Sequence, residues 1–244
     1  MYTFRSRVRY SETDPNGRLR IDALMDYLQD CSAFQSEDLG LGIQWLKDQD
    51  MGWIVNYWQI DLSSLPHLGD EIVIGTSPYA FKGFIGLRNF MIETPEGKRI
   101  VQANSVWSLF NMKKQFPVRV LDIMKERYQL FPKFDMEYTP RKIAVPEGTG
   151  ESLADIYVGE NMLDSNNHVN NVQYVRAAAS FLPEGVQITR IRVEYLQQAH
   201  LGDTIHPHIF RTEGGAVITL DDDGGKPYCV TELQGSEHGE QIKK

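Results

Sequence analysis

The sequence repeats itself once, and this repetition limits the possible folds more than any other feature. Three short motifs occur twice and in the same order: Asp14-Pro15-Asn16-Gly17-Arg18-Leu19 with Asp164-Ser165-Asn166-Asn167-His168-Val169, His67-Leu68-Gly69-Asp70 with His200-Leu201-Gly202-Asp203, and Gly97-Lys98 with Gly225-Lys226. The spacing between partners shrinks along the chain, which indicates shorter loops in the second half. We therefore interpret the chain as a duplication of one structural unit.

Each half contains one predicted helix that follows a polar turn. Apolar residues at helical spacing, Ile21, Leu24, Met25, Leu28 and Cys31, predict the first helix with one apolar face. The second is predicted over residues 170–182, where an apolar face is again present and Pro183 ends the helix. One helix in each half must therefore pack its apolar face against other elements.

Strands surround these helices in both halves. Alternating or apolar runs bounded by turn residues predict strands over residues 2–10, 53–62, 71–77, 84–93 and 99–112, and then over 189–195, 204–211, 216–221 and 228–233. A long helix followed by an antiparallel meander predicts an α+β domain in which the sheet wraps the helix.

The domain boundaries follow from this pattern. We expect a first half over residues 1–120 and a second half over 154–235, joined by a linker over 121–153. The linker begins with a short helical stretch and continues as a polar connection with proline and glycine. Residues 236–244 are expected to form a flexible tail.

Composition excludes several classes of protein. The net charge of −8 argues against nucleic-acid binding, which needs a basic footprint. No run approaches the roughly 20 apolar residues of a membrane span, and the N-terminus has no apolar signal region. The two cysteines, Cys31 and Cys229, fit core positions rather than a disulfide scaffold. A soluble, cytoplasmic protein with no membrane partner is expected.

The stretch that ends at the second helix carries the densest chemistry. An Asn- and Asp-rich turn with a helix cap would explain one of its residues, but not a histidine flanked by several amides. His168 could act as a general base or orient water, Asn166 could hold a carbonyl oxygen or a water, and Asp164 could fix the imidazole or act on water itself. The adjacent helix N-terminus carries partial positive charge that would stabilise an oxyanion.

The run from Leu163 to Tyr174, Leu-Asp-Ser-Asn-Asn-His-Val-Asn-Asn-Val-Gln-Tyr, resembles the signature of the bacterial and plant acyl-ACP thioesterases. Val193-Glu194-Tyr195 and the second His-Leu-Gly-Asp motif extend this resemblance over nearly the whole chain. It implies an α+β double hot-dog fold, with acyl-chain accommodation in the first half and catalysis in the second. It also implies hydrolysis of acyl-ACP to a free fatty acid, with the acyl carrier protein as partner.

Carried over by the resemblance, the motif assigns Asp164, Asn166 and His168 to the active site. Plant members have an acidic residue and a cysteine just beyond Val193-Glu194-Tyr195, where this chain has Gln198 and Ala199. A cysteine nucleophile is therefore impossible at this position, and Gln198 could position water but cannot act as a base. We expect direct attack by water. The first half has Arg18 in place of His168, so we expect one active site in the chain.

Two other readings of the site stay open: an acyl-CoA thioesterase, and a hot-dog protein that binds acyl thioesters without catalysis. A hydratase is disfavoured because the motif resembles the thioesterases. No sequence motif implies a cofactor or a metal. His206 and His208 share one face of a strand, but Pro207 lies between them and no carboxylate-rich partner is evident, so we interpret both as solvated histidines.

The carrier protein is expected to dock on a local basic patch. Candidate residues for this patch are Arg176, Arg190, Arg192 and the pair Lys113 and Lys114. A monomer and a homodimer are both compatible with the sequence.

Overall fold

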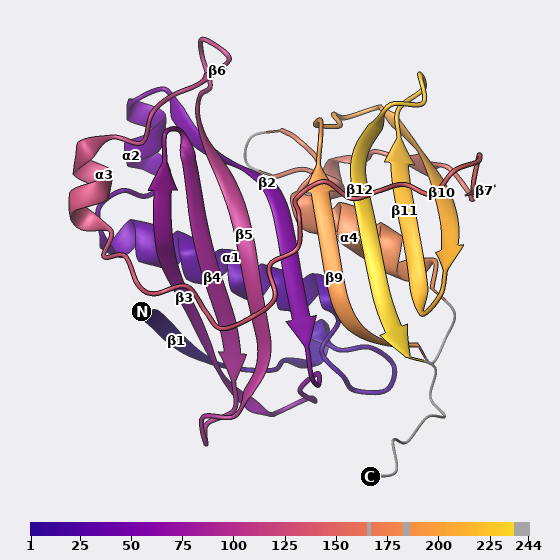
Figure 1. Ribbon diagram of the computed structural model, residues 1–244, viewed down its shortest axis with the longest axis horizontal. Helices are drawn as coiled ribbons and strands as arrows, with labels where there is room; N and C mark the ends of the chain where they lie inside the picture. Colours follow the sequence, from indigo (N-terminus) through magenta and orange to yellow (C-terminus); the bar gives the residue numbers. More distant parts are fainter. Residues whose placement is uncertain (165–166, 183–185, 237–244) are drawn as a thin grey trace. The chain divides into compact units, whose positions relative to one another are not determined.

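The first half forms an antiparallel sheet around a long helix. In the computed structural model, which describes residues 1–164, 167–182 and 186–236, the strand order in this half is β1-β3-β4-β5-β2, with β6 beside β5 (Figure 1). The strands are β1 (Tyr2–Arg7), β2 (Met51–Leu62), β3 (Glu71–Lys82), β4 (Ile85–Glu93), β5 (Arg99–Asn111) and β6 (Phe116–Pro117). The predicted meander is confirmed.

Helix α1 (Ile21–Asp38) packs its apolar face against the sheet, where it contacts β1 and β3. Leu24, Met25, Leu28 and Cys31 are fully buried, as their spacing predicts. Burying one such large side chain contributes about 1.5–3 kcal/mol, so this stripe fixes which face of the helix turns inward. Two short helices, α2 (Ile43–Asp48) and α3 (Asp122–Arg127), and the one-turn η1 (Tyr10–Glu12) complete this half.

The second half repeats this plan in smaller form. Its strand order is β9-β12-β11-β10-β7, with β8 beside β10, and α4 (Asn171–Ser180) packs against β11 and β12. The strands are β7 (Glu151–Ser152), β8 (Ile156–Tyr157), β9 (Gln187–Tyr195), β10 (Thr204–Thr212), β11 (Gly215–Asp221) and β12 (Pro227–Ser236), and η2 (Glu160–Met162) precedes α4. Chain contacts divide the protein into two compact units, Met1–Thr139 and a second that begins at Pro140.

Several boundaries differ from the expectation. The first strand ends at Arg7 because the chain then turns into η1, and α4 ends at Ser180 rather than at residue 182. Helix α2 was not predicted, because six residues are too few to show a helical period. Strand β12 continues to Ser236, and residues 237–244 of the expected tail lie outside the described residues.

The duplication extends to individual backbone hydrogen bonds. The amide of Asp14 donates to the carbonyl of Arg18 at 2.8 Å, and the amide of Asp164 donates to that of His168 at the same distance. The third residue after each aspartate has a positive φ, 75° at Gly17 and 60° at Asn167. Glycine and asparagine are the residues that adopt this left-handed region most readily. The two units therefore share one loop geometry, not only one order of elements.

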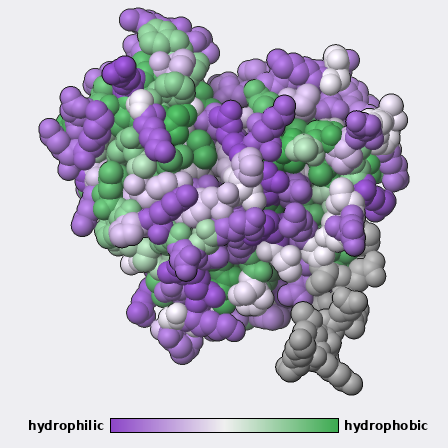
Figure 2. All heavy atoms as spheres, viewed as in Figure 1, coloured by the Kyte–Doolittle hydropathy of each residue, from purple (hydrophilic) through white to green (hydrophobic). Residues whose placement is uncertain are grey.

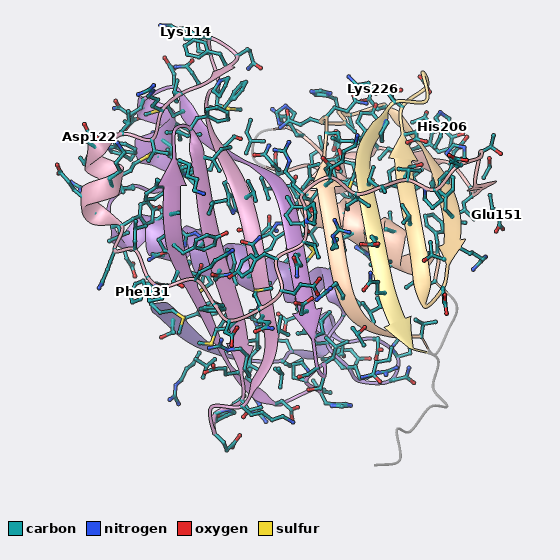
Figure 3. The ribbon with its side chains drawn as sticks, viewed as in Figure 1. Lys114, Asp122, Phe131, Glu151, His206 and Lys226 are labelled. Carbon is teal, nitrogen blue, oxygen red and sulfur yellow. The ribbon has the colours of Figure 1, made fainter. Side chains whose placement is uncertain are left out.

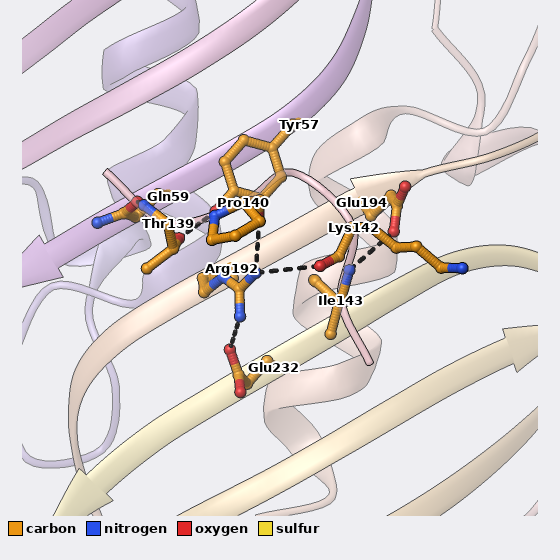
Figure 4. A network of polar contacts seen from close by, with 9 residues as sticks. All are labelled: Tyr57, Gln59, Thr139, Pro140, Lys142, Ile143, Arg192, Glu194 and Glu232. Carbon is orange, nitrogen blue, oxygen red and sulfur yellow. Dashed lines mark hydrogen bonds and ion pairs between the residues drawn. The ribbon is translucent and has the colours of Figure 1, made fainter. Parts of the chain in front are cut away.

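The connection between the units is held by side chains from each of them (Figure 4). In the first unit, Gln59 Nε2 donates to the carbonyl of Glu137 at 2.8 Å. The Oε1 of the same side chain accepts the amide of Thr139 at 3.0 Å. In the second, Arg192 donates to the carbonyl of Pro140 at 2.7 Å. The boundary between the units thus falls inside residues 121–153, the segment expected to be a linker. The residues on both sides of this boundary, Thr139 and Pro140, are hydrogen-bonded to side chains of their own units.

The surface mixes polar and apolar side chains. Figure 2 shows the two kinds interspersed over the visible face. Within the described part of the chain, no helix combines the length and apolarity needed to cross a bilayer.

Candidate active site

The turn before α4 is organised by Asp164. Its amide bonds to the carbonyl of His168 as described above, and its own carbonyl accepts the amide of Asn167 at 3.0 Å. Its Oδ1 also accepts the amide of His168 at 3.3 Å. A short acidic side chain at this position therefore holds the backbone of the turn that presents the imidazole.

Helix α4 begins with a side-chain cap. Asn170 Oδ1 accepts the amide of Val172 at 2.9 Å, which satisfies one of the donors that a helix N-terminus leaves without a partner. The Asn170 amide donates to the carbonyl of Met162 at 2.9 Å and so ties the cap to η2. The cap expected for an Asn-rich turn is present at Asn170, two residues after His168. The positive end of the helix dipole lies beside the turn.

A second loop, residues 196–203 between β9 and β10, is tied to this turn. Val169 donates its amide to the carbonyl of Ala199 at 3.0 Å. Ala199 donates its own amide to the hydroxyl of Tyr174 at 2.9 Å, and Tyr174 lies on the first turns of α4. Since both bonds involve buried atoms or a buried ring, they fix the spacing between the two loops.

This tie places a second histidine against the first. The rings of His168 and His200 meet edge to face, with centroids 5.0 Å apart and planes at 79°. His200 also donates its backbone amide to Asp203 Oδ2 at 2.8 Å, and its Nδ1 lies 3.8 Å from the same oxygen. Tyr228 on β12 donates its hydroxyl to that carboxylate at 3.2 Å. Two imidazoles and two carboxylates thus gather at one end of α4.

The surroundings of His168 favour its neutral form. Partial burial lowers the pKa of His168, and the neighbouring His200 lowers it further, while Asp164 acts in the opposite direction. An imidazole that stays neutral near neutral pH can accept a proton from water, as a general base must.

The four predicted site residues have different positions. Asp164 and His168 share the turn before α4, and Asn166 lies outside the described residues. Gln198 has an exposed side chain in the adjacent loop, next to Ala199, which is completely buried. Their catalytic roles stay predictions.

The sequence analysis named His200 only as part of the repeated His-Leu-Gly-Asp motif and did not single out its partners. These are Asp203, Tyr228 and Tyr174. The signal that could have found them is the repeated His-Leu-Gly-Asp motif, which marks a loop of fixed shape but does not reveal what that loop faces.

The first unit has the same loops without the imidazole. Arg18 takes the place of His168, and its Nε lies 3.5 Å from Asp14 Oδ2. The amide of His67 donates to Asp70 Oδ2 at 2.8 Å, as that of His200 does to Asp203. A guanidinium stays protonated near neutral pH, so this copy offers no general base at the position of His168.

His206 and His208 are partly exposed, and both also contact carboxylates that the sequence analysis did not identify. His206 on β10 contacts Asp155 at 2.8 Å and Asp223 at 2.9 Å, one carboxylate at each ring nitrogen, and His208 Nδ1 lies 3.0 Å from Asp221 Oδ2. Asp221 and Asp223 belong to the acidic run Asp221-Asp222-Asp223 at the end of β11, and Asp155 lies between β7 and β8. The pairing of β10 with β11 brings this run beside the histidines, and the sequence alone does not show that pairing. No group of histidine, cysteine and acidic residues suited to a metal occurs among the described residues.

The cysteines occupy core positions. Cys31 on α1 and Cys229 on β12 are free and fully buried, and burial raises the pKa of each thiol to about 12. Neither thiol has the low pKa of a nucleophile.

Two tandem units, each a helix wrapped by an antiparallel sheet, define the double hot-dog class of α+β proteins. Solved structures agree over nearly the whole chain. An acyl-ACP thioesterase from Bacteroides thetaiotaomicron gives a TM-score of 0.87 at 22% identity, covering 96% of this chain and 97% of the other. The 12:0-ACP thioesterase from Umbellularia californica gives 0.85 at 18% identity, covering 97% and 98%.

The sequence comparison identifies the family. The model of the acyl-ACP thioesterase N-terminal domain matches residues 1–128, more than half of the chain. The chloroplastic acyl-(acyl-carrier-protein) hydrolase FATB3 of Cuphea viscosissima is 26% identical over an alignment 252 residues long, which covers 87% of this chain and 59% of that protein. The oleoyl-acyl carrier protein thioesterase 1 of Arabidopsis thaliana is 23% identical over an alignment 224 residues long, which covers 81% of this chain and 60% of that protein. This chain belongs to the acyl-ACP thioesterase family, and it spans about 59% of the length of the first of these relatives.

Proposed function

We propose that this protein hydrolyses the thioester of acyl-ACP and releases a free fatty acid. The observation that carries the proposal is the partly buried His168, with a lowered pKa, at the N-terminus of α4 in a chain of this family. The relatives named above are hydrolases or thioesterases acting on acyl carrier proteins. We further propose that the first unit accommodates the acyl chain and that the second carries out the chemistry.

The proposed reaction needs one base and one site for negative charge. His168 takes a proton from water as the oxygen attacks the thioester carbonyl, and the carbonyl oxygen becomes an oxyanion beside the positive end of α4. When the tetrahedral intermediate collapses, the carbon–sulfur bond breaks and the protonated His168 returns its proton to the leaving thiolate. Water and thioester become carboxylic acid and thiol, and the imidazole is restored.

Asp164, Asn166 and Gln198 have supporting roles in this proposal. Asp164 holds the turn through the amide of His168, while the amides of Asn166 and Gln198 orient the water or the carbonyl. Because Ala199 stands where plant members have a cysteine, no acyl-enzyme forms. Intact-protein mass spectrometry during turnover should show only the mass of the free protein. A covalent acyl adduct on the protein would contradict direct attack by water.

The test is a matched series of acyl-ACP and acyl-CoA substrates with His168→Ala and His206→Ala. We expect turnover of acyl-ACP to fall by about 10²–10⁴ in His168→Ala, the usual contribution of a general base. His206→Ala, a histidine outside the site, serves as the control and should keep its rate. Faster hydrolysis of acyl-CoA than of acyl-ACP would favour the acyl-CoA thioesterase, and binding without turnover by the folded protein would indicate the non-catalytic acyl-binding protein.

The carrier is proposed to dock through basic residues of the second unit and of the β5–β6 turn. Arg192 donates to Glu232 and to the carbonyl of Pro140, so it is engaged within its own unit. Arg176 is exposed on α4, and Lys114 lies at the tip of the β5–β6 turn (Figure 3). Reversing the charge at Arg176 should raise KM for acyl-ACP more than for acyl-CoA. A homodimer and a cytoplasmic location stay predictions from the sequence.

A further inference from the structure

His200 is the residue outside the predicted site whose side chain contacts it most directly. Its ring meets that of His168 edge to face at 5.0 Å, although the two residues come from different loops. An edge-to-face contact restricts the rotation of both rings, because the edge of one must point at the face of the other. The contact therefore limits the orientations open to the proposed base.

The fold of the loop does not require this imidazole. The turn from His200 to Asp203 is closed by the amide of His200 on the carboxylate, at 2.8 Å, and by the amide of Asp203 on the carbonyl of His200, at 3.1 Å. Both bonds use the backbone of residue 200. Any residue could supply them, and the imidazole is left for another task.

The first unit provides the comparison. His67 closes the same turn with the same bonds, its amide to Asp70 Oδ2 at 2.8 Å and the amide of Asp70 to its carbonyl at 3.0 Å. There the paired residue in the neighbouring loop is Arg18, which forms an isolated β-bridge with His67. The two histidines thus have equal roles in the backbone, and only His200 faces an imidazole.

Among the described residues, ionisable side chains from four elements are bonded to the turn of His168 or to the loop of His200. Asp164 belongs to the turn of His168, Asp203 to the loop of His200, Tyr228 to β12, and Tyr174 to α4. Asp203 is the carboxylate nearest to the His200 ring, with 3.8 Å between Oδ2 and Nδ1, and Tyr228 holds it in place. The neighbouring His200 also lowers the pKa of His168, because two protonated imidazoles this close would repel each other.

We propose that His200 is a positioning residue for His168: its ring, held edge to face against the imidazole of His168, fixes the orientation of the base. This inference rests on the proposed function, since it gives His168 the role of general base. His200 itself does not take the proton from water. Its effect on the rate passes entirely through His168.

The direction of the effect follows from Coulomb's law. Like charges about 5 Å apart repel each other, so a positive charge at residue 200 makes a proton on His168 less favourable. Removing the imidazole at residue 200 therefore raises the pKa of His168, and the base stays protonated up to a higher pH. The acid limb of the profile of kcat/KM against pH then moves upward, and more activity is lost near pH 6 than near pH 8.

The experiment compares wild type with His200→Phe, His200→Gln and His67→Gln. Phenylalanine keeps a ring at the contact without charge, whereas glutamine removes both. We expect both variants at residue 200 to shift the acid limb upward, with a larger loss in the alkaline plateau for His200→Gln. His67→Gln, in the equivalent turn of the first unit, should leave the profile unchanged. The side chain of His200 is 59% exposed, so these substitutions should leave the fold intact.

An NMR titration of His168 separates this inference from the proposed function. Its pKa should rise in His200→Gln whether or not the protein hydrolyses acyl-ACP. The inference would be overturned if the wild type is active and both variants at residue 200 keep the acid limb and the His168 titration of the wild type. An inactive wild type in which the His168 titration still shifts would overturn the proposed function while the coupling between the two rings stands.

Discussion

Arg88 on β4 is a buried cation in the core of the first unit. Its guanidinium donates to Gln35 on α1 and to Thr76 Oγ1 on β3 at 3.1 Å, and lies 5.4 Å from the centre of the Tyr128 ring. Burial lowers the pKa of this arginine, yet arginine keeps its proton near neutral pH. Gln35 and Thr76 are neutral groups, so each hydrogen bond compensates part of the desolvation of a full charge.

Removing one of these partners should destabilise the protein strongly. In Gln35→Leu the guanidinium loses an acceptor inside the core, and we expect a decrease of about 2–3 kcal/mol in the free energy of unfolding. Urea denaturation followed by tryptophan fluorescence measures it. Gln44→Leu, on the exposed face of α2, is the matched control and should change stability by less than about 0.5 kcal/mol. Equal denaturation midpoints for the two variants would show that the hydrogen bond from Arg88 to Gln35 does not contribute to stability.

The sequence predicts part of the candidate site, and there is a physical reason why the remaining contacts were missed. Asp164 and His168 lie four residues apart, so a local motif can reveal both. The pairing of His168 with His200 depends on how two loops meet, through the bonds of Val169 and Ala199. A local pattern carries no information about such a contact.

The same contrast holds for the elements of the fold: elements whose side chains repeat with a period were predicted, and elements without such a period were missed. The long strands and the apolar face of α1 were predicted, because their side chains repeat with a period that the sequence shows. Strands β7 and β8 were missed. Each is two residues long and is defined only by its pairing with β10. Strands of that length have no period to detect.

Strand β10 is linked to its neighbours by a pH-sensitive contact. His206 lies between Asp155, in the segment joining β7 to β8, and Asp223, in the turn between β11 and β12 (Figure 3 labels His206). Hydrogen bonds with Asp223 and Asp155 raise the pKa of His206. Because the folded pKa is raised, this contact stabilises the protein fully below about pH 6.5, the ordinary histidine value, and the contribution is lost as the pH rises through the folded value.

Hydrogen exchange should detect this loss. Protection of the amides in residues 151–157, corrected for intrinsic exchange rates, is expected to fall as the pH rises past the pKa of His206. In His206→Gln the protection should be lower at acidic pH and independent of pH across this range. If the pH profile of amide protection in His206→Gln is identical to that of wild type, then the charge of His206 does not hold the segments of the two carboxylates in place.

The whole molecule is a duplication in which the loop geometry was kept in both units and the base in only one. We therefore predict a single active site in each chain. Arg18→Ala should keep kcat within about twofold of wild type, because Arg18 lies in the unit without the imidazole. Steady-state hydrolysis of acyl-ACP measures this, with thermal unfolding as the check on folding. Loss of turnover in a folded Arg18→Ala protein would show that the first unit takes part in the chemistry.

The hydrogen bonds around the connection also determine where the two units can be separated and recombined. Thr139 is held by Gln59 and the next residue, Pro140, by Arg192, so adding or deleting a residue at this junction breaks a bond on one side. Residues 144–150 follow the buried Ile143 and are largely exposed. Chimaeras that exchange halves between relatives should therefore be joined within residues 144–150, several residues beyond the boundary that contacts alone would suggest.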